Sequence, residues 1–151
     1  MESPGAASAR RPFLFRWGVP DAVARRRAVW AAVAWGVFLL TLTSWPSPPE
    51  VPVVSGIPNF DKLVHTFLYG VEGFLLCRAV AWPDASRSAW LRALAIAGVI
   101  AVWATLDELH QFWIPGRSME GLDAVSDIAG GFTGALTSAW LGLRLRGPAR
   151  L

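Results

Sequence analysis

The residues of this sequence best suited to chemistry are carboxylates and one histidine, which recur at helical spacing in three separate segments. Three pairs of polar residues stand four positions apart: Asp61 and His65, Asp107 and Gln111, Asp123 and Asp127. Because residues i and i+4 share one face of an α-helix, the two members of each pair would point the same way. If the three segments meet, the sequence predicts an acid–base site built from several helix ends.

The candidate catalytic residues are those able to move a proton, and they are His65, Asp61, Asp107 and Glu108. In this hypothesis His65 is the acid/base and Asp61 orients it, while the other two carboxylates are further acid/base groups or metal ligands. The candidate ligand-binding residues are the polar groups around them: Lys62, Tyr69, Gln111, Arg117, Asp123 and Asp127. Lys62 would hold an anionic headgroup as a point charge and Arg117 would hold it through a bidentate pair.

The elements that must position these residues are long and apolar. Of the 151 residues, 54% are hydrophobic and 17% are charged, whereas about 25% of the residues in a soluble domain are charged. The net charge of +3 could suggest a nucleic-acid partner, but the Lys and Arg residues stand in short clusters between apolar runs rather than on one basic segment. This pattern favours a membrane protein.

Four apolar segments of spanning length are expected, at residues 28–45, 62–82, 90–106 and 123–143, since a transmembrane helix needs about 17–25 such residues. The first ends at Pro46 and no small-x-small cleavage site follows it. We therefore interpret it as a span rather than a signal peptide. The sequence predicts an all-α fold, a polytopic membrane bundle of four transmembrane helices.

The positions of Lys and Arg predict the orientation of this bundle. Twelve of the 14 precede the first span, flank the loop between the second and third, or follow the fourth. Since such residues are retained in the cytoplasm, both termini are predicted to be cytoplasmic and the polar residues to face outside. Residues 1–27 would be a basic, partly disordered tail, residues 28–143 the transmembrane domain, and residues 144–151 a short basic tail.

Two further features lie inside the expected spans. Glu72 comes about ten residues into the second span, which at about 1.5 Å per residue is near the bilayer midplane. We expect it to share an inward face with His65 and Tyr69, and the alternative is a neutral carboxylic acid that bonds to a backbone carbonyl. In the fourth span Gly130 and Gly134 form a small-residue pattern that lets helix backbones approach closely.

Two segments of the sequence resemble the VanZ-like family of bacterial integral membrane proteins. They are DKLVHTFLYG, from Asp61 to Gly70, and DELHQFWIPGRSMEGLDAVSDIAGG, from Asp107 to Gly131. The family pattern is a helix start Asp-Lys-x-x-His-x-x-x-Tyr, then Asp-Glu-x-x-Gln-x-Phe/Trp-x-Pro-Gly-Arg and a later Asp. The positions that match are Asp61, Lys62, His65, Tyr69, Asp107, Glu108, Gln111, Pro115, Gly116, Arg117 and Asp123. One departure is Asp127, where the family usually has Asn.

This resemblance implies a multi-pass protein of the bacterial inner (cytoplasmic) membrane and a link to resistance against the glycopeptide teicoplanin. A family alone does not supply a substrate. One function is the binding or shielding of an anionic or amphiphilic envelope ligand, such as a glycopeptide or a lipid-linked cell-wall precursor. The alternative is a membrane-embedded enzyme acting on a lipid or such a precursor through the His/Asp/Glu/Arg site. A third interpretation gives the polar residues only a structural role at the helix ends or in the headgroup layer.

No cofactor is predicted. The sequence lacks the H-E-x-x-H and cysteine-based zinc spacings, the phosphate-binding loop and the dinucleotide fingerprint. A carboxylate-rich site would favour Mg²⁺ or Mn²⁺ over Zn²⁺, so a divalent cation such as Mg²⁺ is the one metal to consider. The expected partners are membrane lipids and an envelope ligand, and nucleic acid is excluded. The single cysteine, Cys77, cannot form an intramolecular disulfide.

Overall fold

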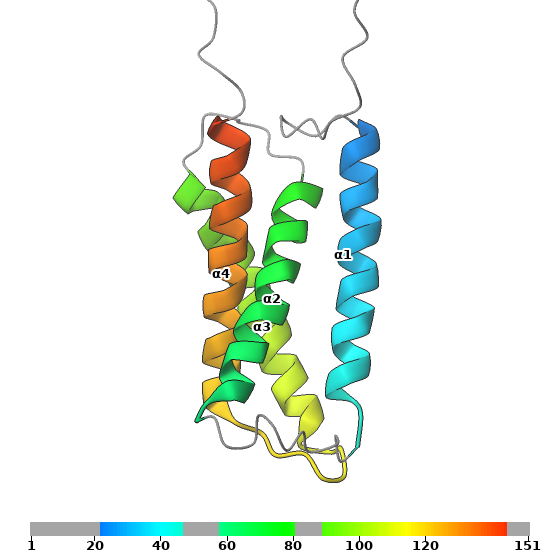
Figure 1. The fold of residues 1–151 in the computed structure, drawn as a ribbon. Coiled ribbons are helices and arrows are strands. Elements are labelled where there is room, and N and C mark those ends of the chain that lie inside the picture. The colour runs from blue at the N-terminus through cyan, green and yellow to red at the C-terminus, as the bar shows by residue number, and fades with distance from the viewer. Residues whose placement is uncertain (1–21, 47–57, 81–88, 145–151) are drawn as a thin grey trace, which may run out of the picture.

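The computed structural model describes residues 22–46, 58–80 and 89–144, and these residues form four α-helices and no strand (Figure 1). The helices are α1 (Ala22–Thr43), α2 (Phe60–Ala79), α3 (Ala89–Gln111) and α4 (Gly121–Arg144). The prediction of an all-α fold with four helices is confirmed. Each helix covers most of one expected span.

The helix bounds differ most from the expected spans at α1 and α3. α1 begins at Ala22 rather than at residue 28, so the basic run Arg25–Arg27 is helical and does not belong to the tail. α3 continues to Gln111 rather than ending at residue 106. Both extensions consist largely of good helix formers, which continue a helix beyond the point where its apolar run stops. The expected disorder near the N-terminus, the end of the second span and the C-terminal tail lie outside the described residues.

The four helices lie side by side along one axis, with α1 and α3 running opposite to α2 and α4 (Figure 1). α2 and α4 form the closest pair. A side chain on Gly130 would collide with the backbone of Thr66, and one on Gly134 would collide with the backbone of Gly70. The predicted small-residue packing is confirmed, because only glycine allows the two backbones this approach.

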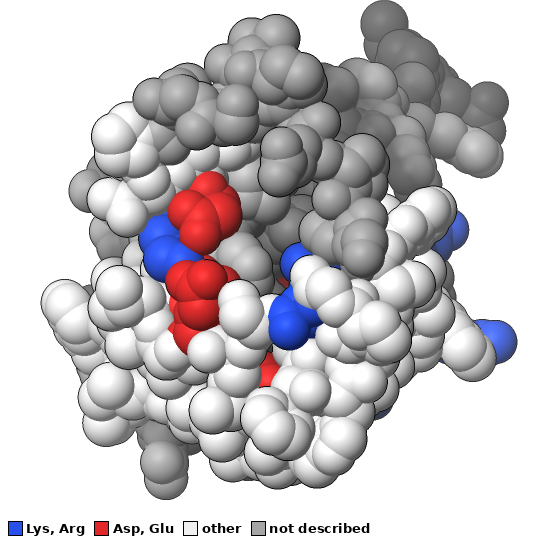
Figure 2. Space-filling model, turned by 90° about the horizontal axis from the view of Figure 1, so that it is seen from below, with Lys and Arg blue, Asp and Glu red and all other residues white. Residues whose placement is uncertain are grey.

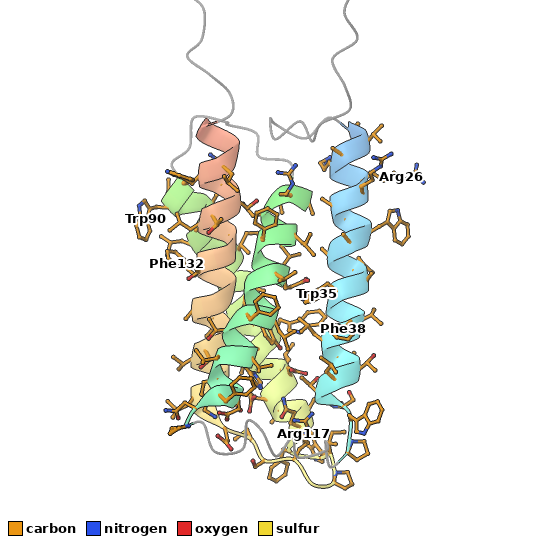
Figure 3. All side chains as sticks on the ribbon, viewed as in Figure 1. Arg26, Trp35, Phe38, Trp90, Arg117 and Phe132 are labelled. Carbon is orange, nitrogen blue, oxygen red and sulfur yellow. The ribbon has the colours of Figure 1, made fainter. Side chains whose placement is uncertain are left out.

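α1 lies mainly against α2. The indole Nε1 of Trp35 donates a hydrogen bond of 2.9 Å to the carbonyl of Leu68, and Trp35 also packs on Phe38 with ring centroids 5.2 Å apart (Figure 3). One turn further along α2, Glu72 is buried and faces Gly36 of α1. The predicted inward face of α2 is confirmed at Tyr69 and Glu72, which are both buried.

The outer surface of the bundle is rich in large apolar side chains, while several charged residues are buried. Exposed apolar side chains occur on all four helices, among them Val33, Val37, Leu63, Phe67, Leu94, Val102, Val125 and Trp140. Buried charged residues include Glu72, Arg92, Asp107, Glu108, Asp123 and Asp127. Among the described helices, α3 alone is long and apolar enough to cross a membrane by length and composition. Cys77 is buried as a packing residue.

Candidate functional site

The polar residues singled out in the sequence gather at one end of the bundle, where α2 and α4 begin and α1 and α3 end. We call this set the polar cluster; it comprises Asp61, Lys62, His65, Tyr69, Asp107, Glu108, Gln111, Glu120, Asp123 and Asp127. Figure 2 looks onto this end and shows acidic and basic side chains close together on it. The three sequence segments therefore meet, which is the condition that the predicted acid–base site required.

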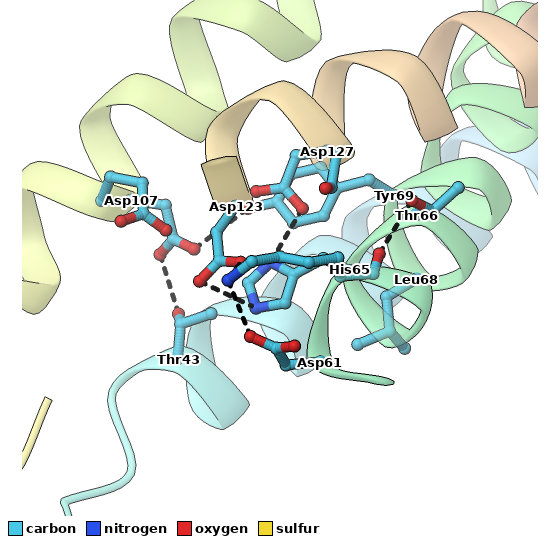
Figure 4. A network of polar contacts seen from close by, with 12 residues as sticks. Thr43, Asp61, His65, Thr66, Leu68, Tyr69, Asp107, Asp123 and Asp127 are labelled. Carbon is cyan, nitrogen blue, oxygen red and sulfur yellow. Dashed lines mark hydrogen bonds and ion pairs between the residues drawn. The ribbon is translucent and has the colours of Figure 1, made fainter. Parts of the chain in front are cut away.

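His65 lies between two carboxylates of α4 (Figure 4). Its Nδ1 is 2.9 Å from Oδ1 of Asp127, whose side chain is fully buried. Its Nε2 is 3.9 Å from Oδ2 of Asp123, which is too long for a hydrogen bond. The prediction that Asp61 orients His65 is wrong, because the side chain of Asp61 is exposed in the first turn of α2 and bonds to Lys62 instead.

Lys62 is held by three carboxylates. Its Nζ lies 2.7 Å from Asp61, 2.7 Å from Glu120 and 2.6 Å from Asp123. The ammonium donates hydrogen bonds to Asp61 and Glu120 and forms an ion pair with Asp123, so carboxylates of the chain itself already surround the charge that was expected to hold an anionic headgroup. The pKa of the Asp61 carboxyl and that of the Glu120 carboxyl are lowered, since hydrogen bonds from Lys62 stabilise the charged forms.

The carboxylates around Lys62 are also the residues that could hold a metal ion. Within the described ranges, the one group of three ligand atoms close enough to share a metal ion belongs to Asp61, Glu120 and Asp123, whose atoms lie within 4.8 Å of one another. The ammonium of Lys62 already contacts all three. The ammonium of Lys62 thus occupies the position between these carboxylates that a metal ion would take, and the geometry does not favour Mg²⁺ there.

Asp107 joins three helices. Its Oδ2 accepts a hydrogen bond of 3.0 Å from the hydroxyl of Tyr69 on α2, and its Oδ1 accepts one of 2.7 Å from the hydroxyl of Thr43 on α1. All three residues are buried. Both oxygens of Asp107 are engaged, so this residue and Tyr69 hold the helix ends together. Thr43 was missed because no sequence signal connects it to a residue 64 positions later.

Glu108, Gln111 and Asp127 carry buried polar atoms that have no hydrogen-bond partner within the described part of the chain. These atoms are Oε1 of Glu108, Nε2 of Gln111 and Oδ2 of Asp127. The exposed fractions of the three residues are 4%, 3% and 0%. A buried polar group without a partner costs about 1–3 kcal/mol. These atoms are therefore the ones that a ligand would satisfy.

Arg117 lies in the loop between α3 and α4 but turns toward α1 (Figure 3). Its Nη2 donates to the carbonyl of Leu42 at 2.7 Å and its Nε to the carbonyl of Trp45 at 3.2 Å. The turn that precedes it contains Gly116 at a φ of 78°, a conformation that glycine adopts without strain. Arg117 thus satisfies carbonyls at the C-terminal end of α1, a role other than the predicted recognition of a headgroup.

None of the protein families, curated proteins and solved structures compared with this chain matches it. The chemistry of the polar cluster therefore follows from its own residues. What they offer is a histidine fixed on one nitrogen by a buried carboxylate, beside carboxylate and amide atoms that have no hydrogen-bond partner among the described residues.

Proposed function

We propose that this chain is a VanZ-like protein with four membrane spans, both termini in the cytoplasm, and the polar cluster at the outer face of the bacterial cytoplasmic membrane. The apolar outer surface of the bundle supports this, since buried charges and exposed apolar side chains suit lipid surroundings. Exposed tryptophans near both ends of the bundle also support it: Trp45 and Trp113 near the polar cluster, and Trp30, Trp90 and Trp140 towards the opposite end.

We further propose that the polar cluster performs acid–base chemistry on the polar end of an amphiphilic envelope molecule, either a lipid or a lipid-linked cell-wall precursor. The contact between Nδ1 of His65 and Asp127 carries this proposal. Because a carboxylate only accepts hydrogen bonds, Nδ1 carries the proton and donates a hydrogen bond to Asp127. Nε2 then remains as the nitrogen that exchanges a proton with the ligand.

The alternative, binding or shielding of a ligand without chemistry, has support of its own in the unpartnered atoms of Glu108 and Gln111. For an anionic ligand this support is weaker, because the two cationic side chains expected to bind it, Lys62 and Arg117, have partners within the chain. Lys62 contacts three carboxylates, and Arg117 contacts two carbonyls of α1. Under either function, glycopeptide protection is the phenotype that the family resemblance leads us to expect.

A complementation assay in a glycopeptide-sensitive host tests the proposal. The wild type is compared with His65→Gln, and Asp61→Asn is the control because it changes a polar residue of the same helix end that does not contact His65. Blotting of the membrane fraction checks the abundance of each variant. We expect lost protection for His65→Gln at wild-type abundance and retained protection for Asp61→Asn. Protection that follows abundance in all variants would leave the cluster with a structural role only.

Labelling of single cysteines tests the membrane topology independently. In a Cys77→Ser background, a cysteine at Ser118 should react with a membrane-impermeant thiol reagent added to intact spheroplasts. A cysteine at residue 85 should react only after the membrane is opened. Reaction of both in intact spheroplasts would exclude the four-span arrangement.

A further inference from the structure

We infer that the polar cluster is a hydrolytic site, in which a water molecule held between Nε2 of His65 and Oδ2 of Asp123 is the nucleophile that cleaves a carboxylic ester. This inference rests on the proposed function and names the reaction class of the same site. Asp123 thereby has two roles, since its Oδ1 contacts Lys62 and its Oδ2 would hold the water.

The distance between His65 and Asp123 is the first argument. Nε2 and Oδ2 are 3.9 Å apart, which is too long for a direct hydrogen bond and is a separation at which a water molecule can bridge two polar atoms. An oxygen about 2.8 Å from each atom would make its two hydrogen bonds at an angle of roughly 90°, close to the angle between the O–H bonds of water. The two atoms are therefore spaced for one bridging water.

The hydrogen-bonding character of the two atoms is the second argument. Nδ1 of His65 donates to Asp127 at 2.9 Å, so Nε2 of the neutral ring is an acceptor, and Oδ2 of the Asp123 carboxylate is an acceptor as well. Two acceptors that face each other need two donor hydrogens between them, which water has and an alcohol hydroxyl lacks. An ammonium group also has enough donors, but it has no lone pair with which to react. A water that donates to both atoms keeps its lone pairs free to attack.

Solvent reaches this pair of side chains. Those of His65 and Asp123 are 18% and 12% exposed, whereas that of Asp127 is fully buried. Asp123 lies in the first turn of α4, and the spacing of four residues puts it on the same face as Asp127, against His65 (Figure 4). Asp127 therefore holds the imidazole from the buried side, and Nε2 faces the carboxylate that lies one turn nearer to the end of the helix.

The charges around Nε2 determine which electrophile fits. The carboxylates of Asp123 and Asp127 lie on the two sides of the imidazole. Lys62 and Arg117, the cationic side chains expected to bind an anion, are engaged by carboxylates and carbonyls of the chain. A phosphodiester anion would be repelled by the two carboxylates, whereas the carbonyl group of a carboxylic ester is neutral. The site therefore suits an ester of an amphiphilic envelope molecule.

His65 serves this reaction first as a base and then as an acid. Nε2 takes a proton from the water while the water oxygen forms a bond to the carbonyl carbon. The imidazolium that results lies between two carboxylates, which stabilise its charge. The bond between the carbonyl carbon and the leaving oxygen then breaks, and the proton on Nε2 passes to that oxygen. Ester and water become a carboxylic acid and an alcohol.

Hydrolysis of p-nitrophenyl laurate by the full-length protein in micelles tests the inference, with bis(p-nitrophenyl) phosphate as the phosphodiester probe. We expect p-nitrophenol to be released from the ester and not from the phosphodiester. We also expect no initial burst of p-nitrophenol, because water rather than a side chain attacks the carbonyl. Absence of ester cleavage would overturn the inference, as would a burst equal to the protein concentration or faster cleavage of the phosphodiester.

Variants of the two residues assign the reaction to this pair. His65→Gln should lower kcat about 10²–10⁴-fold, and Asp123→Ala should lower it at least about tenfold with little change in KM. Asp123→Asn keeps an oxygen that accepts from the water and should recover part of the lost rate. Thermal unfolding in micelles checks that each variant is folded.

The matched control is Asp61→Asn, which changes another carboxylate that contacts Lys62 and does not contact His65. It should leave the rate of ester cleavage unchanged. A wild-type rate in both Asp123 variants, or an equal loss in Asp61→Asn, would overturn the inference.

Failure of this inference can be told from failure of the proposed function. If the ester is not cleaved but His65→Gln still abolishes protection at wild-type abundance, the bound water is wrong and the acid–base function stands. If the ester is not cleaved and His65→Gln protects normally, both are wrong. If the ester is cleaved through His65 and Asp123 while His65→Gln protects normally, hydrolysis stands and protection is not its result.

Discussion

Two neighbouring parts of the polar cluster each hold two carboxylates beside a nitrogen base, but they differ in how far the carboxylates are buried and in whether their oxygens have partners. In the Lys62 corner, formed by Lys62, Asp61 and Glu120, the ammonium contacts both carboxylates at 2.7 Å, and these carboxylates are about half exposed. In the His65 corner, formed by His65, Asp127 and Glu108, both carboxylates are buried and each has an oxygen without a partner among the described residues. Asp123 lies between the two corners.

Under the proposed function, this difference separates charges that complete the fold from charges that would bind a ligand. Exposed ion pairs contribute about 0–1 kcal/mol to the free energy of unfolding. The Lys62 corner therefore changes the stability of the fold only a little. Buried acceptors without donors are costly, and they persist where a ligand or a reaction uses them.

The largest effect is expected at Asp127. Asp127→Ala removes the hydrogen bond that orients His65, and loss of a charge-assisted bond of about 1.5–3 kcal/mol lowers a rate about ten- to hundredfold. Asp127→Asn keeps an oxygen that accepts from Nδ1 and should retain most of the protection in the complementation assay. Asp61→Ala, the matching change in the Lys62 corner, should retain nearly all of it. Equal losses at Asp127 and Asp61 would remove the distinction between the corners.

The next effect concerns stability rather than activity. Tyr69→Phe leaves a buried oxygen of Asp107 without its donor, which should lower the free energy of unfolding by about 1–3 kcal/mol. Thermal unfolding of the purified protein in micelles measures this. Thr43→Val removes the other donor to Asp107 and should have a similar effect. If Tyr69→Phe abolished protection at unchanged stability, Tyr69 would belong to the binding site instead.

Arg117 should show a smaller structural effect. Arg117→Lys keeps the positive charge but loses the planar pair of donors that serves Leu42 and Trp45, so we expect destabilisation of about 0.5–1.5 kcal/mol. Protection per molecule in the membrane should be unchanged. A loss of protection at unchanged stability would restore Arg117 to its predicted role as a ligand-binding residue.

The smallest effect is a pH dependence in the Lys62 corner. Lys62 lowers the pKa of Asp61 and of Glu120 in the folded protein. A group with a lowered folded-state pKa stabilises the fold above its ordinary pKa of about 4 and loses that contribution as the pH falls through the folded-state value. The Tm of the wild type in micelles should therefore decrease slightly from pH 5 to pH 3. In Lys62→Met this decrease should vanish, because protonation then relieves repulsion among the carboxylates; an unchanged decrease would contradict the ion-pair assignment.

The parts of this molecule that follow from helical periodicity could be predicted from the sequence. The four helices follow from their apolar runs, and the approach of α2 to α4 follows from the glycines of α4. The three polar segments gather because the alternating directions of the helices bring the starts of α2 and α4 and the end of α3 to the same end of the bundle. Each of these depends on residues close together in the sequence.

The pairing of individual side chains could not be predicted, because it depends on how the helices are rotated against one another. Asp61 and His65 share a face of α2, yet the buried Asp127 of α4 contacts His65. Glu120 was not among the candidate residues, but its side chain bonds to Lys62 and its backbone N–H to Glu108. The turn at Gly116 sends Arg117 towards α1, away from Lys62 and the cluster.

The central claim is that Nδ1 of His65 is fixed by Asp127 and that Nε2 exchanges the proton. ¹⁵N NMR of the imidazole nitrogens in micelles over pH 5–8 tests it directly, with His110→Gln to assign the signals of the two histidines in this chain. The account predicts that Nδ1 stays protonated throughout and that only Nε2 changes its protonation. A neutral ring protonated on Nε2, or the same titration in Asp127→Ala as in the wild type, would contradict it.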